Sequence, residues 1–207
     1  MDNHYQSLRS DIYLLLATLF RQAPSEELIE FLSNIEIETE DSLMQQAWSS
    51  LKAAAIQSES SALEEEYQTL FIGIGRGEAV PFGSWHMTGS LMEKPLALLR
   101  QDLKALGVVR DENVKEPEDH ISALCEVMAM LTDENENTQQ QFFNAHISPW
   151  YVSLNAQIEQ AKHANFYKQA SQLLSAFLHI EQIRFSEKLA GSSSKLTINV
   201  NNISNSL

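Results

Sequence analysis

The residues of this sequence best suited to chemistry are Asp119 and His120, an adjacent carboxylate and imidazole that could act as acid and base. No Ser or Cys stands in a recognisable nucleophile motif beside them, and the six histidines lack the H-E-x-x-H spacing of metal ligands. Pro117 predicts the start of a helix, which places Glu118 and Asp119 in a first turn that favours carboxylates. Spacing alone therefore favours a structural role, with no metal or cofactor.

A glycine-rich segment, Gly73-Ile74-Gly75-Arg76-Gly77, offers a second kind of chemistry, because such loops can bind phosphate. It lacks the Lys-Ser/Thr pair of a P-loop, and Glu78 stands where a G-x-G-x-x-G motif requires its third glycine. A predicted helix, not a strand, precedes it, so we interpret the segment as a turn. A small nucleotide-binding or hydrolytic protein that uses this turn with Asp119 and His120 is the alternative hypothesis.

Aromatic residues gather on either side of this turn. Tyr67, Leu70 and Phe71 end the preceding helix, and the segment Pro81-Phe82-Gly83-Ser84-Trp85 follows in a predicted loop. Aromatic side chains on loops often form recognition surfaces, since rigid rings provide contact area at low entropic cost. The same side chains could instead fill the core, which the pattern taken alone favours.

The helices that must position these residues follow from apolar periodicity. Neither a strand alternation of convincing length nor an internal repeat is present. Ser25 predicts an N-cap, Ser61 with Glu64 a capping box, and Gly107 a helix end. We expect one all-α helical bundle over residues 1–190, with the glycine-rich loop after its fourth helix and a flexible polar tail over 191–207. The expected helices cover residues 5–20, 28–32, 43–56, 63–71, 95–106, 117–131, 149–161 and 166–180.

The charge balance limits the possible partners. Asp and Glu number 28 against 14 Lys and Arg, a net charge of −14, and residues 26–66 alone hold eleven acids and one base. Such a chain repels nucleic acid and anionic membranes. Its acidic stretches could steer a basic partner, or they could simply be solvated faces, which composition alone favours. The single Cys125 excludes an internal disulfide, and no export signal or membrane-spanning segment is visible, so we expect a cytoplasmic protein.

Three short segments carry a resemblance to a known family. They are Glu66-Tyr67-Gln68-Thr69-Leu70-Phe71, Pro81-Phe82-Gly83-Ser84 and Glu116-Pro117-Glu118-Asp119-His120, and in this order they resemble the signature segments of the TorD/DmsD family of redox-enzyme maturation chaperones. The similarity in layout runs from about residue 5 to 185. Phe82 stands where the DmsD branch usually has Trp, which leaves the client enzyme open.

The resemblance implies an all-helical, non-enzymatic chaperone. It would bind the twin-arginine signal peptide of a molybdenum-cofactor oxidoreductase of the dimethyl-sulfoxide or trimethylamine-N-oxide reductase type, as a monomer or a domain-swapped homodimer. Carboxylates at Asp119 and Glu116 would attract the arginines, and apolar side chains would contact the apolar part of the peptide. A general scaffold that engages a basic or apolar helix unrelated to export is a further alternative. The implied binding residues are Tyr67, Leu70, Phe71, Pro81, Phe82, Ser84, Trp85, Glu116, Asp119 and His120.

Overall fold

The computed structural model describes residues 2–38, 41–73 and 76–186, and within these ranges it contains helices and no strand. The all-α prediction is confirmed, whereas the predicted tail over 191–207 lies outside the described residues. The elements are α1 (Asp2–Arg21), α2 (Glu26–Asn34), α3 (Leu43–Gln57), α4 (Ser60–Tyr67), the π-helix η1 (Gln68–Ile72), α5 (Gly83–Thr88), α6 (Lys94–Ala105), α7 (Ile121–Leu131), α8 (Glu136–His146), α9 (Tyr151–Gln160) and α10 (Phe166–Ser186).

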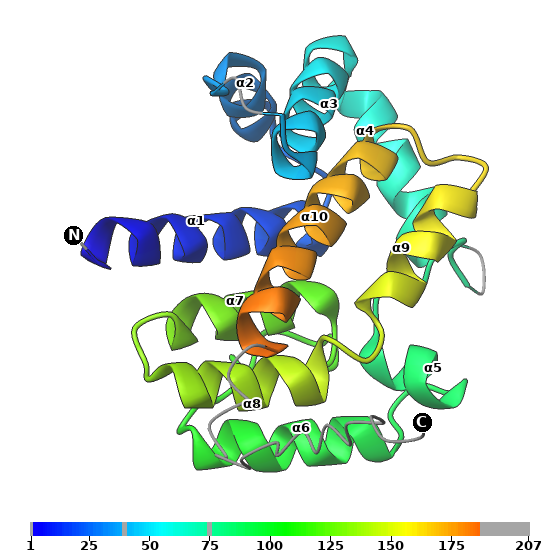
Figure 1. Ribbon diagram of the computed structural model, residues 1–207. Helices are drawn as coiled ribbons and strands as arrows, with labels where there is room; N and C mark the ends of the chain where they lie inside the picture. Colours follow the sequence, from blue (N-terminus) through cyan, green and yellow to red (C-terminus); the bar gives the residue numbers. More distant parts are fainter. Residues whose placement is uncertain (1, 39–40, 74–75, 187–207) are drawn as a thin grey trace, which may run out of the picture.

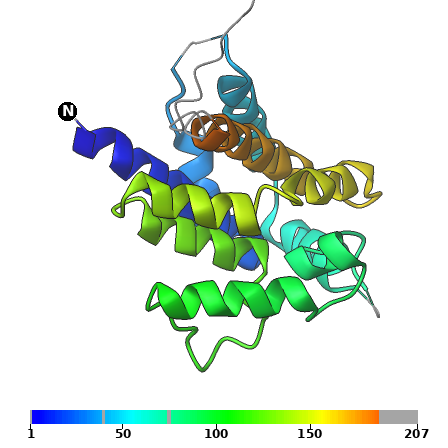
Figure 2. The ribbon, with the colours of Figure 1, turned by 60° about the horizontal axis from the view of Figure 1, so that its bottom comes forward.

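The helices form two groups that α10 joins (Figure 1). At one end, α1 packs against α7, α7 against α8, and α8 against α6 (Figure 2). At the other end α3 packs against α2 and α10. Helix α10 runs between the groups and contacts α1, α3, α4, α8 and α9. The short α5 packs against α6 and α9, so it lies where the first group meets α9.

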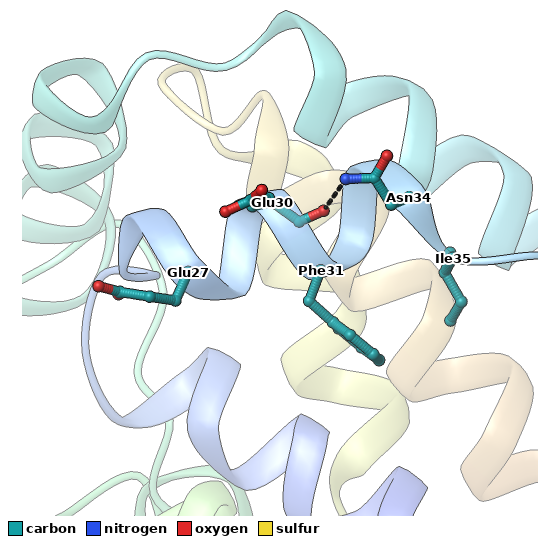
Figure 3. Close-up of a pocket in the computed structure, with 5 residues that line it drawn as sticks. All are labelled: Glu27, Glu30, Phe31, Asn34 and Ile35. Atoms are coloured by element: carbon teal, nitrogen blue, oxygen red, sulfur yellow. Dashed lines mark hydrogen bonds between the residues drawn. The ribbon is translucent and has the colours of Figure 1, made fainter.

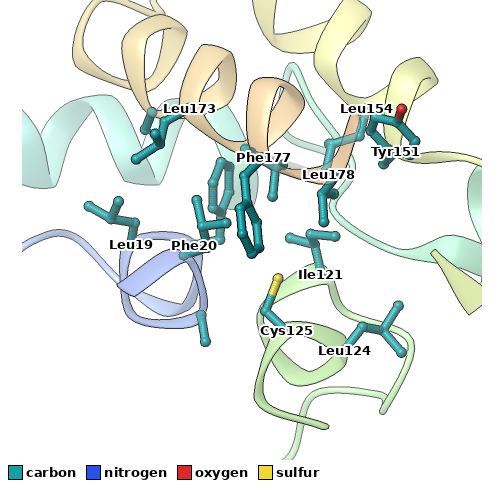
Figure 4. Packing of buried hydrophobic residues seen from close by; sticks show 14 of the residues in the cluster. Leu19, Phe20, Ile121, Leu124, Cys125, Tyr151, Leu154, Leu173, Phe177 and Leu178 are labelled. Carbon is teal, nitrogen blue, oxygen red and sulfur yellow. The ribbon is translucent and has the colours of Figure 1, made fainter. Parts of the chain in front are cut away.

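The apolar core lies where α1, α7, α9 and α10 meet (Figure 4). Phe20, Ile121, Leu154 and Leu178 are each at most 1% exposed, and they come from these four helices. Cys125 is also fully buried, and burial raises the pKa of its thiol, which keeps it protonated and unreactive. Long-range packing of amphipathic faces therefore supplies most of the stability of helices this short.

A buried ion pair ties α10 to α1. The Arg9 guanidinium donates to both carboxylate oxygens of Glu181, over 3.0 and 2.6 Å, and to Gln139 on α8 over 2.9 Å. Tyr13 also donates to Glu181, over 2.9 Å. Because a buried charge without a partner is costly, loss of Arg9 or Glu181 alone would strongly destabilise this junction.

Several predicted helix ends are confirmed by the backbone. Ser25 accepts from the Leu28 N–H over 3.3 Å, Pro95 stands in the first turn of α6, and Gly107 follows α6 with a left-handed φ of 72°. These signals are local, since each depends on residues within one turn of the helix end.

Other predicted starts are wrong. Residues 117–119 form a turn and α7 begins only at Ile121, while α9 begins at Tyr151, after Pro149. The capping box of Ser61 and Glu64 is absent as well, because α4 starts two residues earlier than that box requires, with Glu59 at its N-cap and no side-chain cap bond. Two helices, α5 and α8, were not predicted.

Candidate functional site

The second and third signature segments lie side by side. Phe82 and His120 form an isolated antiparallel bridge, in which the Gly83 N–H donates to the Asp119 carbonyl over 2.9 Å and the Ile121 N–H donates to the Pro81 carbonyl over 2.9 Å. These two backbone bonds hold the start of α5 against the turn that precedes α7. Residues that are separated by about 40 positions in the sequence thereby share one small site.

Asp119 caps α5 from outside that helix. Its Oδ2 atom accepts from the Ser84 N–H over 2.7 Å, at the positive end of the α5 dipole. The residue is 3% exposed, and its buried Oδ1 atom has no hydrogen-bond partner among the residues that the structure describes. The predicted role in the first turn of α7 is therefore wrong, because Asp119 precedes that helix. Half of a buried carboxylate is left without a donor, which is energetically costly.

His120 is the N-cap residue of α7 and does not form an acid–base pair with Asp119. Its Nδ1 accepts from the Ser122 N–H over 3.1 Å, so in the neutral ring the proton is on Nε2. Burial, with a smaller contribution from the Arg21 cation, lowers the His120 pKa to about 4. The ring meets Phe82 edge to face, at 4.9 Å between centroids. The His120 imidazole is therefore neutral and packed against Phe82 at neutral pH.

Side chains of the first signature segment are buried in the core. Tyr67 and Phe71 are 7% exposed and Leu70 is 0% exposed. The Tyr67 hydroxyl donates to the Arg21 carbonyl over 2.6 Å, and the Phe71 ring lies 4.9 Å from that of Tyr167. Burial first, then the charges of Glu116 and Glu64, raises the Tyr67 pKa to about 12. In this conformation these residues support the site from beneath and present no open surface.

Glu66, in the same segment, has a role that sequence reasoning did not assign. Its Oε1 accepts from the Asn165 and Tyr167 N–H groups, both over 2.8 Å, and its Oε2 accepts from the Phe166 N–H over 3.2 Å. Glu66 therefore caps the N-terminus of α10 from α4. No periodicity signals such a cap, since its donors lie about 100 residues away.

The described residues of the glycine-rich turn, Gly73, Arg76 and Gly77, are held by close backbone contacts, whereas Ile74 and Gly75 lie outside the described residues. The Gly73 N–H donates to the Gln68 carbonyl over 2.7 Å, which closes the π-helix, and the Ala79 N–H donates to the Leu70 carbonyl over 2.9 Å. A Cβ on Gly77 would lie 2.4 Å from that Leu70 oxygen, so no other residue fits there. Gly73 and Gly77 are therefore needed for the close approach of the backbone within this turn.

The surface beside Asp119 is apolar. Phe82 and Trp85 are partly exposed, and Met87, Leu91 and Met92 are 43%, 47% and 71% exposed. The Ser84 hydroxyl accepts from the Met92 N–H over 3.2 Å, which holds the loop after α5 against the site. Met92 has a φ of 60°, a strained conformation for a side chain of that size.

His86, which the sequence did not single out, holds α5 in place. Its Nε2 donates to the Val80 carbonyl over 2.7 Å, and its Nδ1 accepts from the Ser153 hydroxyl over 2.9 Å. The ring stacks on Trp150, at 5.2 Å between centroids. Burial lowers the His86 pKa, so the neutral ring ties α5 to α9.

The predicted acidic border is partly used by the protein itself. Glu116 is exposed, whereas Glu118 accepts from Arg100 over 3.0 and 2.8 Å and lies 3.7 Å from Arg110. Partial burial acts to raise the Glu118 pKa, but the Arg100 hydrogen bonds and the two cations lower it overall. Glu118 is thus neutralised by arginines of this chain.

A hollow of about 350 Å³ lies elsewhere, along α2. Glu27, Phe31 and Ile35 extend from the same side of that helix, and the Asn34 amide donates to the Glu30 carbonyl over 2.8 Å (Figure 3). None of the predicted binding residues lines it. Within the described ranges, no three His, Cys, Asp or Glu side chains group as a metal site requires.

Comparison with known proteins defines the class. Residues 37–156, more than half of the chain, match the family described as nitrate reductase delta subunit. The matched region contains the bridge between Phe82 and His120. The chain belongs to this family, which includes the TorD-type chaperones, and it is a redox-enzyme maturation chaperone, not an enzyme.

Individual relatives agree. The chain is 24% identical over 202 residues to the chaperone protein TorD of Vibrio atlanticus, covering 86% of this chain and 94% of that one. It is 26% identical over 154 residues to TorD of Actinobacillus succinogenes, covering 73% and 79%. A crystal structure described as a redox enzyme maturation protein, from Archaeoglobus fulgidus, shares the fold with a TM-score of 0.54 at 17% identity, over 84% of this chain and 93% of that one. No helix in the described part of the chain is long and apolar enough to cross a membrane.

Proposed function

We propose that this chaperone binds the twin-arginine signal peptide of a molybdenum-cofactor oxidoreductase of the dimethyl-sulfoxide or trimethylamine-N-oxide reductase type. It acts in the cytoplasm and assists maturation of that precursor before export. The three signature segments and the similarity to TorD chaperones support this function. The proposed partners are the leader peptide and the oxidoreductase precursor that carries it.

The observation that carries the proposal is the free Oδ1 atom of Asp119. A carboxylate that is 3% exposed and has one oxygen without a donor is in an unfavourable state. A guanidinium supplies several N–H donors and a positive charge, and charge-assisted hydrogen bonds are the strongest kind available to it. An arginine of the leader therefore gains more at Asp119 than at an exposed, hydrated carboxylate. Because Asp119 is only 3% exposed, the approach of this arginine requires side chains that cover the carboxylate to move aside.

The apolar part of the leader contacts a surface that differs from the one expected from the motifs. Tyr67, Leu70 and Phe71 are too deeply buried to receive it without rearrangement. The exposed side chains of Met87, Leu91 and Met92 lie on α5 and the loop that follows it. Methionine is flexible and polarizable, so it adapts to apolar segments of different sequence. We assign the h-region contact to these three residues together with Phe82.

Calorimetry with synthetic leaders tests the function. Peptides with a twin-arginine n-region and an apolar h-region should bind, and matched peptides with Lys-Lys or Ala-Ala in place of the arginine pair should bind more weakly. Equal affinity for all three peptides would favour the general scaffold over the export chaperone. Absence of binding to every leader by protein that still melts cooperatively would contradict the proposal. Light scattering on the same samples would separate the monomer from the domain-swapped homodimer.

A further inference from the structure

Arg76 differs from every other arginine of this chain. All six arginines lie among the described residues, and five of them contact a carboxylate. Within the same described part, Arg76 contacts none and instead lies over the indole of Trp85, with 4.7 Å from its guanidinium carbon to the ring centroid. In a chain with 28 acidic residues, a guanidinium held on an aromatic face and away from carboxylates requires a structural cause.

The backbone around Arg76 provides that cause. Gly77 packs against the Leu70 carbonyl, where a Cβ would lie at 2.4 Å, and a Cβ on Gly73 would lie 2.4 Å from the Arg76 carbonyl. The nearest carboxylate in the sequence, Glu78, is already engaged, since it accepts from the His163 N–H over 3.1 Å and contacts the His163 ring over 2.6 Å. The turn therefore directs Arg76 towards Trp85.

The Trp85 face adjoins the site of the proposed function. Trp85 follows Ser84, whose N–H is bonded to Asp119, so Trp85 lies in the first turn of α5, the turn that Asp119 caps. Together they offer what a pair of arginines requires, namely an unpaired carboxylate oxygen and an aromatic face for cation–π stacking. In the free protein, the second of these two positions is occupied by Arg76.

We propose that Arg76 is an internal competitor that occupies the position on Trp85 taken by one arginine of the incoming leader. This inference rests on the proposed function and specifies how the site weakens and tunes its own affinity. Binding of a leader displaces Arg76 into solvent, and its positive charge then repels the leader arginine that took its position on Trp85. A leader with lysines displaces Arg76 less effectively, because an ammonium lacks the planar stacking of a guanidinium.

The test is a double-mutant cycle on leader affinity. Arg76→Ala should bind a twin-arginine leader about two- to fivefold more tightly than the natural chain, the range expected for an exposed cation–π contact. Trp85→Leu should bind it more weakly. In the Trp85→Leu background, Arg76→Ala should give little further gain in affinity, since the indole for which Arg76 and the leader arginine compete is gone. Melting curves of all variants would confirm that each is folded.

Lys104→Ala serves as the matched control for net charge. Lys104 is exposed in the last turn of α6, so its loss changes the overall charge equally but leaves Trp85 untouched. Its effect on affinity should stay below twofold at physiological salt, where distant surface charges are screened. A gain from Lys104→Ala as large as that from Arg76→Ala would overturn the inference, as would an Arg76→Ala gain that persists in full without Trp85.

Failure of the inference can be distinguished from failure of the function. If the natural chain binds leaders and Arg76→Ala binds them no more tightly, the competitor is rejected and the proposed function stands. If neither protein binds any leader, both are rejected. An independent readout is available from the free protein, in which the Arg76 side-chain proton resonances should carry a ring-current shift that Trp85→Leu removes and that added leader also removes.

Discussion

Two carboxylates of this chain cap helices to which they do not belong, and they do so differently. Glu66 uses both oxygens to accept three backbone N–H groups at the start of α10. Asp119 uses one oxygen to accept a single N–H at the start of α5, and the other oxygen is buried without a partner. Both residues belong to signature segments of the family resemblance, and motif matching alone treats them alike.

The difference separates a structural role from a recognition role. A saturated carboxylate has nothing further to offer a ligand, and its contribution is to the stability of the fold. An unsaturated buried carboxylate retains a strong acceptor that a cationic donor can satisfy, at a cost to the free protein. Hydrogen-bond accounting thus ranks Asp119 above Glu66 as a binding residue. The following variants test that ranking, from the largest expected effect to the smallest.

His120→Asn should remove the part of the pH dependence of the free energy of unfolding that arises from His120. The His120 pKa is about 4 in the fold, against an ordinary value of 6.5, so the unfolded chain takes up the proton first. Stability is therefore complete above about pH 6.5 and falls by roughly 3 kcal/mol as the pH drops to 4. Urea unfolding at a series of pH values should show this slope in the natural chain and a smaller one in the variant, which keeps an N-cap side chain. Equal slopes would contradict the assignment.

Glu66→Ala should lower the free energy of unfolding by about 2 kcal/mol, because three N–H groups of α10 lose their acceptor. Leader affinity should stay unchanged, since Glu66 is outside the proposed site. Glu66→Gln, which keeps a hydrogen-bonding oxygen, should lose less stability. A Glu66→Ala protein of natural stability but impaired leader binding would reverse the ranking of the two caps.

Asp119→Asn should show the opposite pattern. The amide oxygen can still accept from the Ser84 N–H, so we expect a stability change below about 1 kcal/mol. Affinity for a twin-arginine leader should fall at least about tenfold, or about 1.4 kcal/mol, because the charge that attracts the guanidinium is gone. Calorimetry and urea unfolding on the same preparation separate the two effects. Undiminished affinity would remove Asp119 from the site.

Ser84→Ala should have the smallest effect. The Ser84 hydroxyl accepts from the Met92 N–H over 3.2 Å, a partly buried bond whose loss costs about 1 kcal/mol. The cap formed by Asp119 uses the Ser84 backbone and should persist. A much larger loss of unfolding free energy would mean that the loop after α5, with the strained Met92, depends on this hydroxyl more than its geometry indicates.

The sequence singled out residues that lie together in the fold, but it did not predict their contacts. Asp119 and His120 were singled out by type, and Phe82 and Ser84 by motif, and the structure brings these four together. Other features were not predicted. No motif includes Met87, Leu91 or Met92. Helix α5 is too short for its apolar periodicity to be detected in a glycine-rich segment. Glu66 lies in a signature segment, but its hydrogen-bond partners could not be predicted, because these donors lie at the start of α10.

The sequence by itself determined that this chain is helical, approximately where most helices lie, and that its net charge is −14. It could do so because burial of one helix face and the total charge are properties of neighbouring residues and of composition. Only the tertiary structure decided that α7 starts after Pro117, which carboxylate oxygen lacks a donor, and that Arg76 meets Trp85. Each of these depends on where distant segments return to one another, and a cap supplied by another segment, or a stacked cation, has no sequence spacing to mark it.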